Sequence, residues 1–395
     1  MKWKSILERQ QEWNSEDSSN KRLTIDEAIE LYENAPFHDL MIAADNRRKQ
    51  MLSNGFITYL VDRNINYTNE CIINCQFCSF YRSPGHDEAY TQTFEEISSR
   101  VSELEEIGGS RILMQGGVNP NLDFDWYESL IKFLTKKHPT IDLDCFSPIE
   151  IEGIAEVTGI STINVLTRLK AAGMHGLPGG GAEMLVDDIR SDISPKKGAP
   201  ENWLKVMEEA QSIGLTTSAT NVFGFGENKS DRIQHMHRIR DLQDKSLAEY
   251  GNGFTSFIAW PVQLEVNTFG KRNRGQNKYV LGAGTTEYLR HVAISRLFFD
   301  NILNIQSSWP TMGLDIAQMA LMAGANDVGS TMMEENVVSA SGTDKMSASE
   351  VELQSIIIRA GFEAIKRDSD YNHLNTTIHV NNMKILPSPV PKQIV

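Results

Sequence analysis

The chain has 395 residues, with 38 Lys and Arg against 52 Asp and Glu and a formal net charge of −14. This acidic balance argues against broad binding to nucleic acid or to an anionic membrane surface, because phosphate groups are bound by clustered Lys and Arg. The four cysteines are too few for a disulfide framework. The N-terminus is polar and no apolar run reaches about 18 residues, so we expect a cytoplasmic protein without a membrane span.

Predicted helices and strands alternate along the chain. A first helix begins after Thr24, whose hydroxyl can cap it while the Glu27 side chain reaches back. A second capping box, formed by Thr93 and Glu96, opens a helix that ends at Gly108. Eight β-type runs precede helical stretches, and they are Gly55–Leu60 leading into Asn64–Thr68, Ser110–Gln115, Ile141–Ser147, His175–Leu177, Thr216–Val222, Gly253–Trp260, Asn304–Ser308 and Asn326–Gly329.

Eight strand–helix units favour parallel crossovers and predict an α/β fold. We expect a (β/α)8 TIM-type barrel with an N-terminal helical extension and a short C-terminal tail, and with the active site at the carboxyl ends of the strands. An open doubly wound sheet is the alternative. Residues 1–54 would form the helical lead-in packed on the barrel, residues 55–374 the barrel, and residues 375–395, with three alternating prolines, an extended tail.

Three of the four cysteines fall within eight consecutive positions just after the first predicted strand: Cys71, Cys75 and Cys78. The spacing is C-x3-C-x2-C. Three thiolates on one loop can hold three irons of a [4Fe–4S] cluster and leave the fourth iron open to another ligand. Phe77 and Tyr81 would cover such a cluster and exclude water.

A structural zinc site is a competing interpretation of the same cysteines. Zinc in a structural site requires four ligands, and the fourth cysteine, Cys145, is distant in the sequence. His86 is another candidate for the fourth ligand. Buried thiols without metal are a third interpretation, although three in eight residues would be an unusual choice for packing. We expect Cys145 itself to be a small core residue.

The cysteine spacing, and its place after the first strand, resemble the radical S-adenosylmethionine superfamily. In that superfamily a glycine-rich edge after the second strand binds the methionine amino group, and Gln115, Gly116 and Gly117 occupy that place here. One branch, the futalosine-pathway menaquinone enzymes and the deazaflavin-cofactor synthase subunits, is similar over nearly the whole chain, and the cyclic dehypoxanthine futalosine synthases are the most similar group within it. The stretches that carry this resemblance are residues 62–69, 78–82, 178–185, 238–244 and 324–338.

The resemblance implies two cofactors, a [4Fe–4S] cluster with one open iron and S-adenosylmethionine. It implies that dehypoxanthine futalosine is the small-molecule substrate, which loses a ribose hydrogen to a 5′-deoxyadenosyl radical and cyclises for menaquinone synthesis. It also implies a low-potential electron donor such as flavodoxin or ferredoxin. The sister activities, aminofutalosine synthase and deazaflavin-cofactor synthase subunit, stay open as alternatives, and so does a non-catalytic iron–sulfur or zinc protein.

The resemblance also implies roles for individual residues. Cys71, Cys75 and Cys78 would bind the cluster. Glu183 would accept hydrogen bonds from the cofactor ribose, unless it is an acid that stabilises a helix N-terminus. Arg190 would pair with the methionine carboxylate, unless it is a solvated helix residue. The full set of cofactor-binding candidates is Phe77, Tyr81, Gln115, Gly116, Gly117, Ser147, Glu183 and Arg190.

Substrate-binding candidates follow or begin the last three strands, where they would face the barrel mouth. They are Trp260, Gln263, Glu265, Gln306, Ser308, Trp309 and Asn326, with Asp327 beside the last. The two tryptophans can instead be core residues. A helix N-terminus near Ser330 would bind the substrate benzoate. Glu227 is the catalytic candidate, but Phe225 and Val118 stand where histidine is expected in relatives, so the proton acceptor is unassigned.

Overall fold

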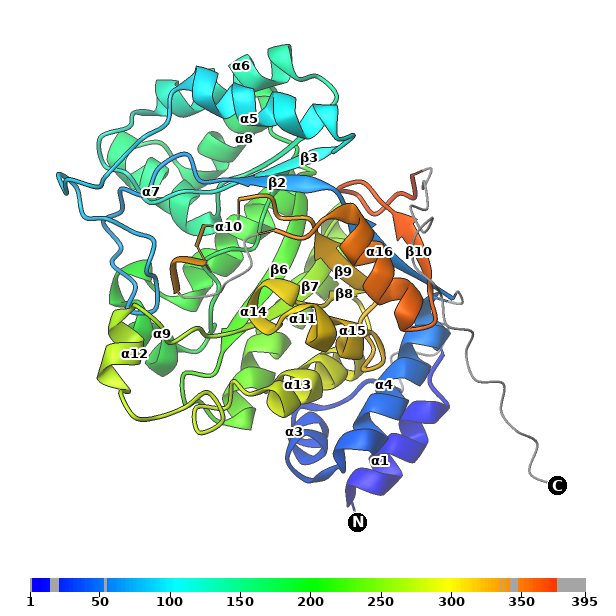
Figure 1. Ribbon diagram of the computed structural model, residues 1–395. Coiled ribbons are helices and arrows are strands. Elements are labelled where there is room, and N and C mark those ends of the chain that lie inside the picture. The colour runs from blue at the N-terminus through cyan, green and yellow to red at the C-terminus, as the bar shows by residue number, and fades with distance from the viewer. Residues whose placement is uncertain are drawn as a thin grey trace.

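One curled sheet of ten parallel strands, covered on its outside by helices, forms the body of the molecule (Figure 1). The structure is a computed structural model and describes residues 2–14, 21–52, 55–334, 336–337, 339–341 and 347–374. The strand order is β10-β1-β9-β8-β7-β6-β5-β4-β3-β2. The strands are β1 (Phe56–Leu60), β2 (Asp62–Ile65), β3 (Arg111–Met114), β4 (Asp142–Cys145), β5 (Gly176–Leu177), β6 (Thr216–Phe223), β7 (Phe254–Pro261), β8 (Asn304–Gln306), β9 (Asp327–Ser330) and β10 (Glu363–Lys366).

Helices connect nearly every strand to the next. They are α1 (Lys2–Gln11), α3 (Ile25–Asn34), α4 (Phe37–Leu52), α5 (Phe94–Glu106), α6 (Phe124–Lys137), α7 (Pro148–Thr158), α8 (Thr162–Ala172), α9 (Asp187–Ile193), α10 (Pro200–Ser212), α11 (Lys229–Tyr250), α12 (Thr268–Arg272), α13 (Thr285–Phe298), α14 (Trp309–Met312), α15 (Leu314–Leu321) and α16 (Glu350–Arg359), with 3-10 turns η2 (Pro195–Lys197) and η3 (Ser339–Ser341). All eight predicted strands are confirmed, with β1 and β2 together forming the first. The additional strand β10 is not among the predicted ones.

The first predicted strand bends at Val61, which separates β1 from β2. On one side β1 pairs with β9, where Leu60 is opposite Ser330, and on the other side β2 pairs with β3, where Asn64 is opposite Leu113. The backbone N–H of Asn64 also donates to the Met333 carbonyl at 3.0 Å. The bent strand therefore pairs with β9 through its first half and with β3 through its second half, and this closes the sheet. The barrel is thus confirmed, and the open doubly wound sheet is excluded.

Local sequence signals define the helix ends. Thr24 and Glu27 form a complete capping box at the start of α3, and Thr93 and Glu96 form another at the start of α5, as predicted. α8 ends at Gly173, whose φ of 118° lies in the left-handed region that favours glycine.

The N-terminal helices α1, α3 and α4 pack together, and α3 and α4 also contact α11 and α13 of the barrel. Arg22 strengthens this contact, because its guanidinium pairs with Asp244 at 2.5 Å and with Asp300 at 2.7 Å. The division at residue 54 stays a prediction, and the predicted tail lies outside the described residues. No helix within the described ranges is long and apolar enough to span a membrane.

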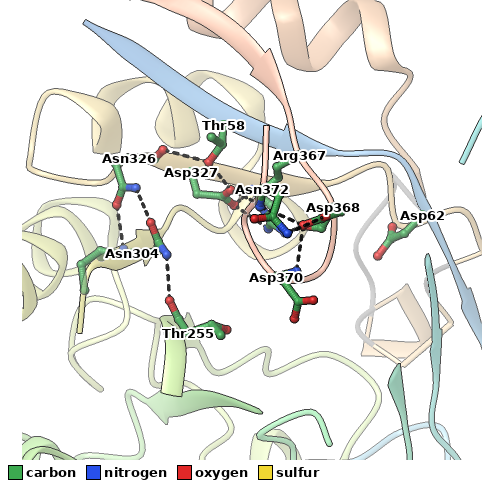
Figure 2. Close-up of polar contacts among 12 residues, drawn as sticks. Thr58, Asp62, Thr255, Asn304, Asn326, Asp327, Arg367, Asp368, Asp370 and Asn372 are labelled. Atoms are coloured by element: carbon green, nitrogen blue, oxygen red, sulfur yellow. Dashed lines mark hydrogen bonds and ion pairs between the residues drawn. The ribbon is translucent and has the colours of Figure 1, made fainter. Parts of the chain in front are cut away.

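A polar network joins Thr58 of β1 to the residues at the start of β8 and β9 (Figure 2). The Asp327 carboxylate accepts the Thr58 hydroxyl at 2.6 Å and the Arg367 Nε at 2.5 Å. The neighbouring Asn326 donates to the side chain of Asn304 at 2.9 Å. These side chains therefore hold β9 and the segment after β10 against the rest of the sheet.

The network corrects two predictions about the eighth strand. Asn326 was expected to face the barrel mouth, but its Oδ1 accepts Arg296 of α13 at 2.6 Å. Successive side chains on a strand point to opposite faces, so Asn326 faces the helix layer while Asp327 pairs with Arg367. The prediction of a helix N-terminus near Ser330 is also wrong, because β9 continues to that residue. The hydroxyl of the following residue, Thr331, donates to the Asp62 carbonyl at 2.7 Å.

Candidate functional site

A cavity of about 240 Å³ opens at the carboxyl ends of the barrel strands. All three clustered cysteines line it, together with most of the predicted cofactor residues. The predicted residues that it brings together are Cys71, Cys75, Cys78, Phe77, Tyr81, Gln115, Gly116, Gly117, Ser147, Glu183, Trp260 and Gln263. Segments far apart in the sequence therefore converge at the end of the barrel where ligands bind in this fold.

Backbone hydrogen bonds shape the cysteine loop. The N–H of Cys71 donates to the Arg82 carbonyl at 2.8 Å, and the N–H of Cys78 donates to the Cys75 carbonyl at 3.2 Å. The Cys71 sulfur accepts the N–H of Ile73 at 3.4 Å. Burial raises the pKa of the Cys78 thiol to about 12 and raises that of Cys71 as well. A positively charged metal group would therefore be needed to hold these sulfurs as thiolates.

The geometry does not support a zinc site. Among the described residues, no three His, Cys, Asp or Glu side chains converge on one ion position. His86 is exposed, and its Nδ1 accepts the N–H of Glu88 at 3.1 Å. Cys145 is buried in the core, away from the cavity. Three cysteines that share a cavity without converging on one point fit a multi-iron cluster, whose sulfur ligands bind different irons.

The glycine edge packs against the cysteine loop itself. A Cβ atom on Gly116 would lie 2.8 Å from the ring of Tyr67, and one on Gly117 would lie 2.1 Å from the carbonyl oxygen of Glu70. Both positions therefore need glycine because the strand end and the loop touch there. The N–H of Gly117 donates to the Thr68 carbonyl at 3.1 Å and fixes this contact.

Glu150 is a site residue that the sequence analysis missed. It is buried at the cavity wall, and its carboxylate accepts the Tyr67 hydroxyl at 2.8 Å, the Gly116 N–H at 3.0 Å and the Ser147 hydroxyl at 2.7 Å. Burial raises the pKa of Glu150 to about 7. A local sequence pattern could have identified Glu150, because Ser147 and Glu150 have the S-x-x-E spacing of a capping box. Ser147 does cap α7.

Glu183 and Lys197 form a buried ion pair on the cavity wall. Glu183 has a φ of 43°, so its backbone is left-handed and turns the carboxylate toward the cavity. Helix α9 begins only at Asp187, which argues against the interpretation of Glu183 as a helix N-terminal acid. The Lys197 ammonium lies 5.4 Å from the centre of the Phe77 ring. No local motif marks Lys197, since only the folded chain brings η2 beside the loop that follows β5.

Arg190 is buried and holds the loops that carry this ion pair. Its Nη1 donates to the carbonyls of Gly181 and Ala182 at 2.9 Å and 2.8 Å, and its Nε donates to the Gly198 carbonyl at 3.0 Å. The interpretation of Arg190 as a solvated helix residue is therefore excluded. Its Nη2 has no hydrogen-bond partner among the described residues, but Arg190 does not line the cavity itself.

Glu227 lies outside the cavity. Its carboxylate accepts the N–H groups of Gly224 and Phe225 at 2.9 Å and 2.7 Å and pairs with Arg232 at 2.6 Å. All of these contacts stabilise the loop after β6. The predicted catalytic role of Glu227 therefore has no support in this geometry.

The remaining substrate candidates are divided between three environments. Glu265 is exposed, and its carboxylate accepts the N–H of the preceding residue at 3.0 Å. Gln306 lines a second, interior cavity of about 70 Å³ below the first. Ser308 is buried, and Trp309 is a core residue whose indole N–H donates to the Ser330 carbonyl at 2.9 Å. Trp260 lines both cavities and lies where they join.

Comparisons with known proteins agree with this geometry. Residues 65–239 match the Radical SAM superfamily, and residues 251–380 match the CofH/MqnC C-terminal region. A cyclic dehypoxanthine futalosine synthase of Halalkalibacterium halodurans is 40% identical, over 91% of this chain and 93% of its own. A 5-amino-6-(D-ribitylamino)uracil–L-tyrosine 4-hydroxyphenyl transferase of Methanopyrus kandleri is 34% identical, over 85% of this chain and 88% of its own.

The fold has solved counterparts. The FeFe-hydrogenase maturase HydG of Carboxydothermus hydrogenoformans superposes with a TM-score of 0.70 over 93% of this chain and 80% of its own. Its sequence identity is 16%, so this similarity shows the fold alone.

Proposed function

Because the chain belongs to the radical SAM superfamily, and within it to the CofH/MqnC family, we propose that it is an enzyme that cyclises dehypoxanthine futalosine in menaquinone biosynthesis. The observation that carries the proposal is the convergence of three thiols, a glycine edge and the Glu183–Lys197 pair on one cavity. The 40% identity to a synthase of that name, over nearly the full length of both chains, favours this substrate. The cytoplasm is the proposed location.

The proposed cofactors are a [4Fe–4S] cluster and S-adenosylmethionine, which together would supply the 5′-deoxyadenosyl radical that takes a ribose hydrogen from the substrate. In this proposal Cys71, Cys75 and Cys78 hold three irons. Glu183 accepts hydrogen bonds from the cofactor ribose, and the free Nη2 of Arg190 supplies a donor near the methionine end. These residues orient the cofactor, and the buried cavity wall excludes water from the reacting atoms.

The glycine edge has a defined role in the proposal. Gln115, Gly116 and Gly117 present backbone groups to the methionine end of the cofactor, and Glu150 holds this edge through the Gly116 N–H. Ser147 keeps Glu150 in place by donating to its carboxylate. Phe77 and Tyr81 cover the cluster side of the cavity. The chain's contribution is thus to hold the reacting groups in position.

The substrate would lie at the junction of the two cavities. Trp260 lines both, so it can contact substrate that reaches from the interior toward the cofactor. Gln263 lines the upper cavity and Gln306 the interior one, and their amides can bind polar groups of the substrate at either end.

Anaerobic incubation of the reconstituted enzyme tests the proposal. With a reductant, S-adenosylmethionine and dehypoxanthine futalosine, we expect equal amounts of 5′-deoxyadenosine and of the cyclic product, identified by mass spectrometry. Formation of 5′-deoxyadenosine without cyclic product would contradict the assigned substrate. In that case tyrosine with 5-amino-6-(D-ribitylamino)uracil is the next substrate pair to supply, because a relative with that activity is 34% identical.

A further inference from the structure

The backbone of Glu183 is held in an unfavourable conformation by its neighbours. Its φ of 43° is left-handed, which is uncommon for a residue with a side chain and persists only where the surroundings hold it. The Glu183 carbonyl accepts two hydrogen bonds, from the Val222 N–H at 2.8 Å and from the side-chain amide of Asn221 at 2.7 Å. Asn221 therefore helps to fix the backbone that turns the Glu183 carboxylate toward the upper cavity.

Asn221 belongs to β6, but its side chain points away from the barrel interior. Its neighbours Thr220 and Val222 line the interior and the upper cavity, and successive side chains of a strand point to opposite faces. The Oδ1 of Asn221 lies 2.9 Å from the Nε2 of His291 in α13. The Nδ1 of His291 lies 2.9 Å from the hydroxyl of Tyr32 in α3. A chain of side chains thus runs from the helix layer to the loop that carries Glu183.

Each group in this chain has one orientation that satisfies its neighbours. The Glu183 carbonyl only accepts, so the nitrogen of the Asn221 amide must face it and the oxygen must face His291. That oxygen also only accepts, so the Nε2 of His291 carries the proton. Burial and the nearby charge of Arg232 lower the pKa of His291 well below its ordinary value, so the ring is neutral and its Nδ1 accepts the Tyr32 hydroxyl. The Tyr32 oxygen accepts the Nη1 of Arg232 at 2.9 Å.

The chain begins in the N-terminal helices and is closed to water along its length. Helix α3 packs on α11 and α13 (Figure 1). The exposed fractions of Tyr32, His291 and Asn221 are 1%, 0% and 0%. Water cannot replace a partner that one of these groups loses, and a buried polar group without a partner is costly. A change at Tyr32 should therefore be passed on to His291 and Asn221.

We propose that Tyr32, His291 and Asn221 are positioning residues, which hold the backbone of Glu183 so that its carboxylate meets the cofactor ribose. The inference rests on the proposed function, from which it takes the role of Glu183. It gives the N-terminal helices a part in cofactor binding, although none of the three residues lines the upper or the interior cavity. If they only satisfied buried polar groups, substitutions would change the stability of the protein and leave cofactor affinity unchanged.

Tyr32→Phe tests the proposal, because it removes one hydroxyl and almost no volume. Without that donor the Nδ1 of His291 can carry the ring proton, and the Asn221 amide can then turn its nitrogen away from the Glu183 carbonyl. We expect the Kd for S-adenosylmethionine, measured by calorimetric titration of the cluster-loaded enzyme, to rise by about three- to ten-fold.

Tyr59→Phe is the matched control. Tyr59 is equally buried, and its hydroxyl also takes part in two hydrogen bonds, as a donor to Glu350 at 2.8 Å and as an acceptor from Gln354 at 2.8 Å. It should lower the free energy of unfolding by an amount similar to that of Tyr32→Phe, while the Kd for S-adenosylmethionine stays at the wild-type value. A Kd that is the same in both variants would overturn the proposal.

Two substitutions of His291 separate its hydrogen bond to Asn221 from its volume. His291→Gln keeps a side-chain N–H that can donate to the Asn221 oxygen, so its Kd should stay within about three-fold of the wild type. His291→Leu has no such donor and should raise the Kd by about ten-fold or more. An equal Kd in the two variants would contradict the role of this hydrogen bond.

A double-mutant cycle shows whether the effect passes through Glu183. Glu183→Gln alone should raise the Kd for S-adenosylmethionine. Adding Tyr32→Phe to it should cause little further change, because the carboxylate that the chain positions is no longer present. If Tyr32→Phe raised the Kd by the same factor in both backgrounds, its effect would not pass through Glu183, and the proposal would fail.

The tautomer of His291 is a second readout, which requires neither cofactor nor substrate. Nitrogen chemical shifts of the full-length chain labelled at histidine should show the proton on Nε2, with the signal assigned from its absence in His291→Gln. A proton on Nδ1 would overturn the proposal. Failure of the cyclisation reaction would leave these measurements intact. An unchanged Kd in Glu183→Gln would instead contradict the cofactor role of Glu183 in the proposed function, and this inference with it.

Discussion

The polar groups are paired with one another in one cavity of the barrel and are left available in the other. In the interior cavity the charged side chains bind one another: Arg111 pairs with Asp62 at 2.5 Å, and Arg367 pairs with Asp327 at the same distance. In the upper cavity the cysteine sulfurs and the glycine edge leave groups for a ligand. The first arrangement stabilises the barrel, and the second keeps binding capacity at a cost in stability.

The difference shows that burial of charge alone does not identify the functional end of this barrel. The interior cavity is richer in ion pairs, yet each of them closes a seam between strands. The upper cavity has the larger volume, about 240 Å³ against about 70 Å³, and it is the one that the cysteines reach. Substitutions in the two cavities should therefore change different measured quantities.

The largest expected effect is the loss of the cluster. Cys75→Ala removes one of three thiolates, so we expect no stable cluster and no detectable 5′-deoxyadenosine. Iron content and turnover of the anaerobically reconstituted protein check this. Cys145→Ala is the matched control, because that thiol is buried in the core and outside the cavity. Equal iron content in both variants would contradict the assignment of the cysteine loop.

In the interior cavity we expect a loss of stability without loss of cofactor binding. Arg367→Met leaves the Asp327 carboxylate buried without its cation, which costs about 3–5 kcal/mol in the free energy of unfolding. Arg272→Met breaks the ion pair with Asp192, whose side chains are 43% and 53% exposed, and should cost less than about 1 kcal/mol. Chemical denaturation measures both. Similar small losses would mean that the interior pairs do not stabilise the barrel.

At the glycine edge we expect weakened binding of the cofactors. Gly117→Ala places a Cβ 2.1 Å from the Glu70 carbonyl, so the strand end and the cysteine loop must separate, at a cost of about 1–3 kcal/mol. Iron content should fall, and the KM for S-adenosylmethionine should rise. Gly55→Ala is the control, since its Cβ meets nothing within 4 Å. An unchanged KM in Gly117→Ala would show that the edge does not contact the cofactor.

Glu150→Gln should have a smaller effect. A glutamine amide accepts through one oxygen only, so one of the donors from Tyr67, Gly116 and Ser147 loses its partner. We expect the KM for S-adenosylmethionine to rise by about ten-fold, equivalent to about 1.4 kcal/mol. An unchanged KM in a folded Glu150→Gln variant would show that Glu150 does not contribute to cofactor binding.

The same residue predicts a pH dependence of stability. Its pKa is raised from 4.5 in the unfolded chain to about 7 in the fold, so between these values the folded protein binds the extra proton. Stability should therefore fall as pH rises through this window, by at most about 3 kcal/mol from this group. Denaturation curves of the wild type and Glu150→Gln should diverge across the window, and parallel curves would contradict the shift.

Features with local sequence signals could be predicted. The cysteine spacing, the capping boxes at Thr24 and Thr93, and the apolar runs of the eight strands depend on residues close together in the chain. The strand β10, Glu363–Lys366, has no such signal because it is short and mixes charged with apolar residues. Its position is determined by pairing with β1, some 300 residues earlier.

The missed and misplaced site residues have the same physical cause. Lys197 pairs with Glu183, and Arg190 holds the adjacent Gly198 carbonyl, and no motif encodes either contact. Asn326 and Asp327 are both polar, so the sequence does not reveal which of the two side chains faces the barrel interior and which faces the helices. Strand order could thus be predicted, whereas the direction of individual side chains required the packed structure.

The bent strand at Val61 has a consequence for when the cysteine loop acquires its final shape. The strand that leads into this loop is paired on both edges only after residues near Thr331, 269 positions after Asp62, have docked. Contacts between such distant positions carry a large loop-closure entropy and form late in folding. A nascent chain can thus expose its three thiols long before they are correctly spaced, so assembly of the cluster would report on completion of the fold.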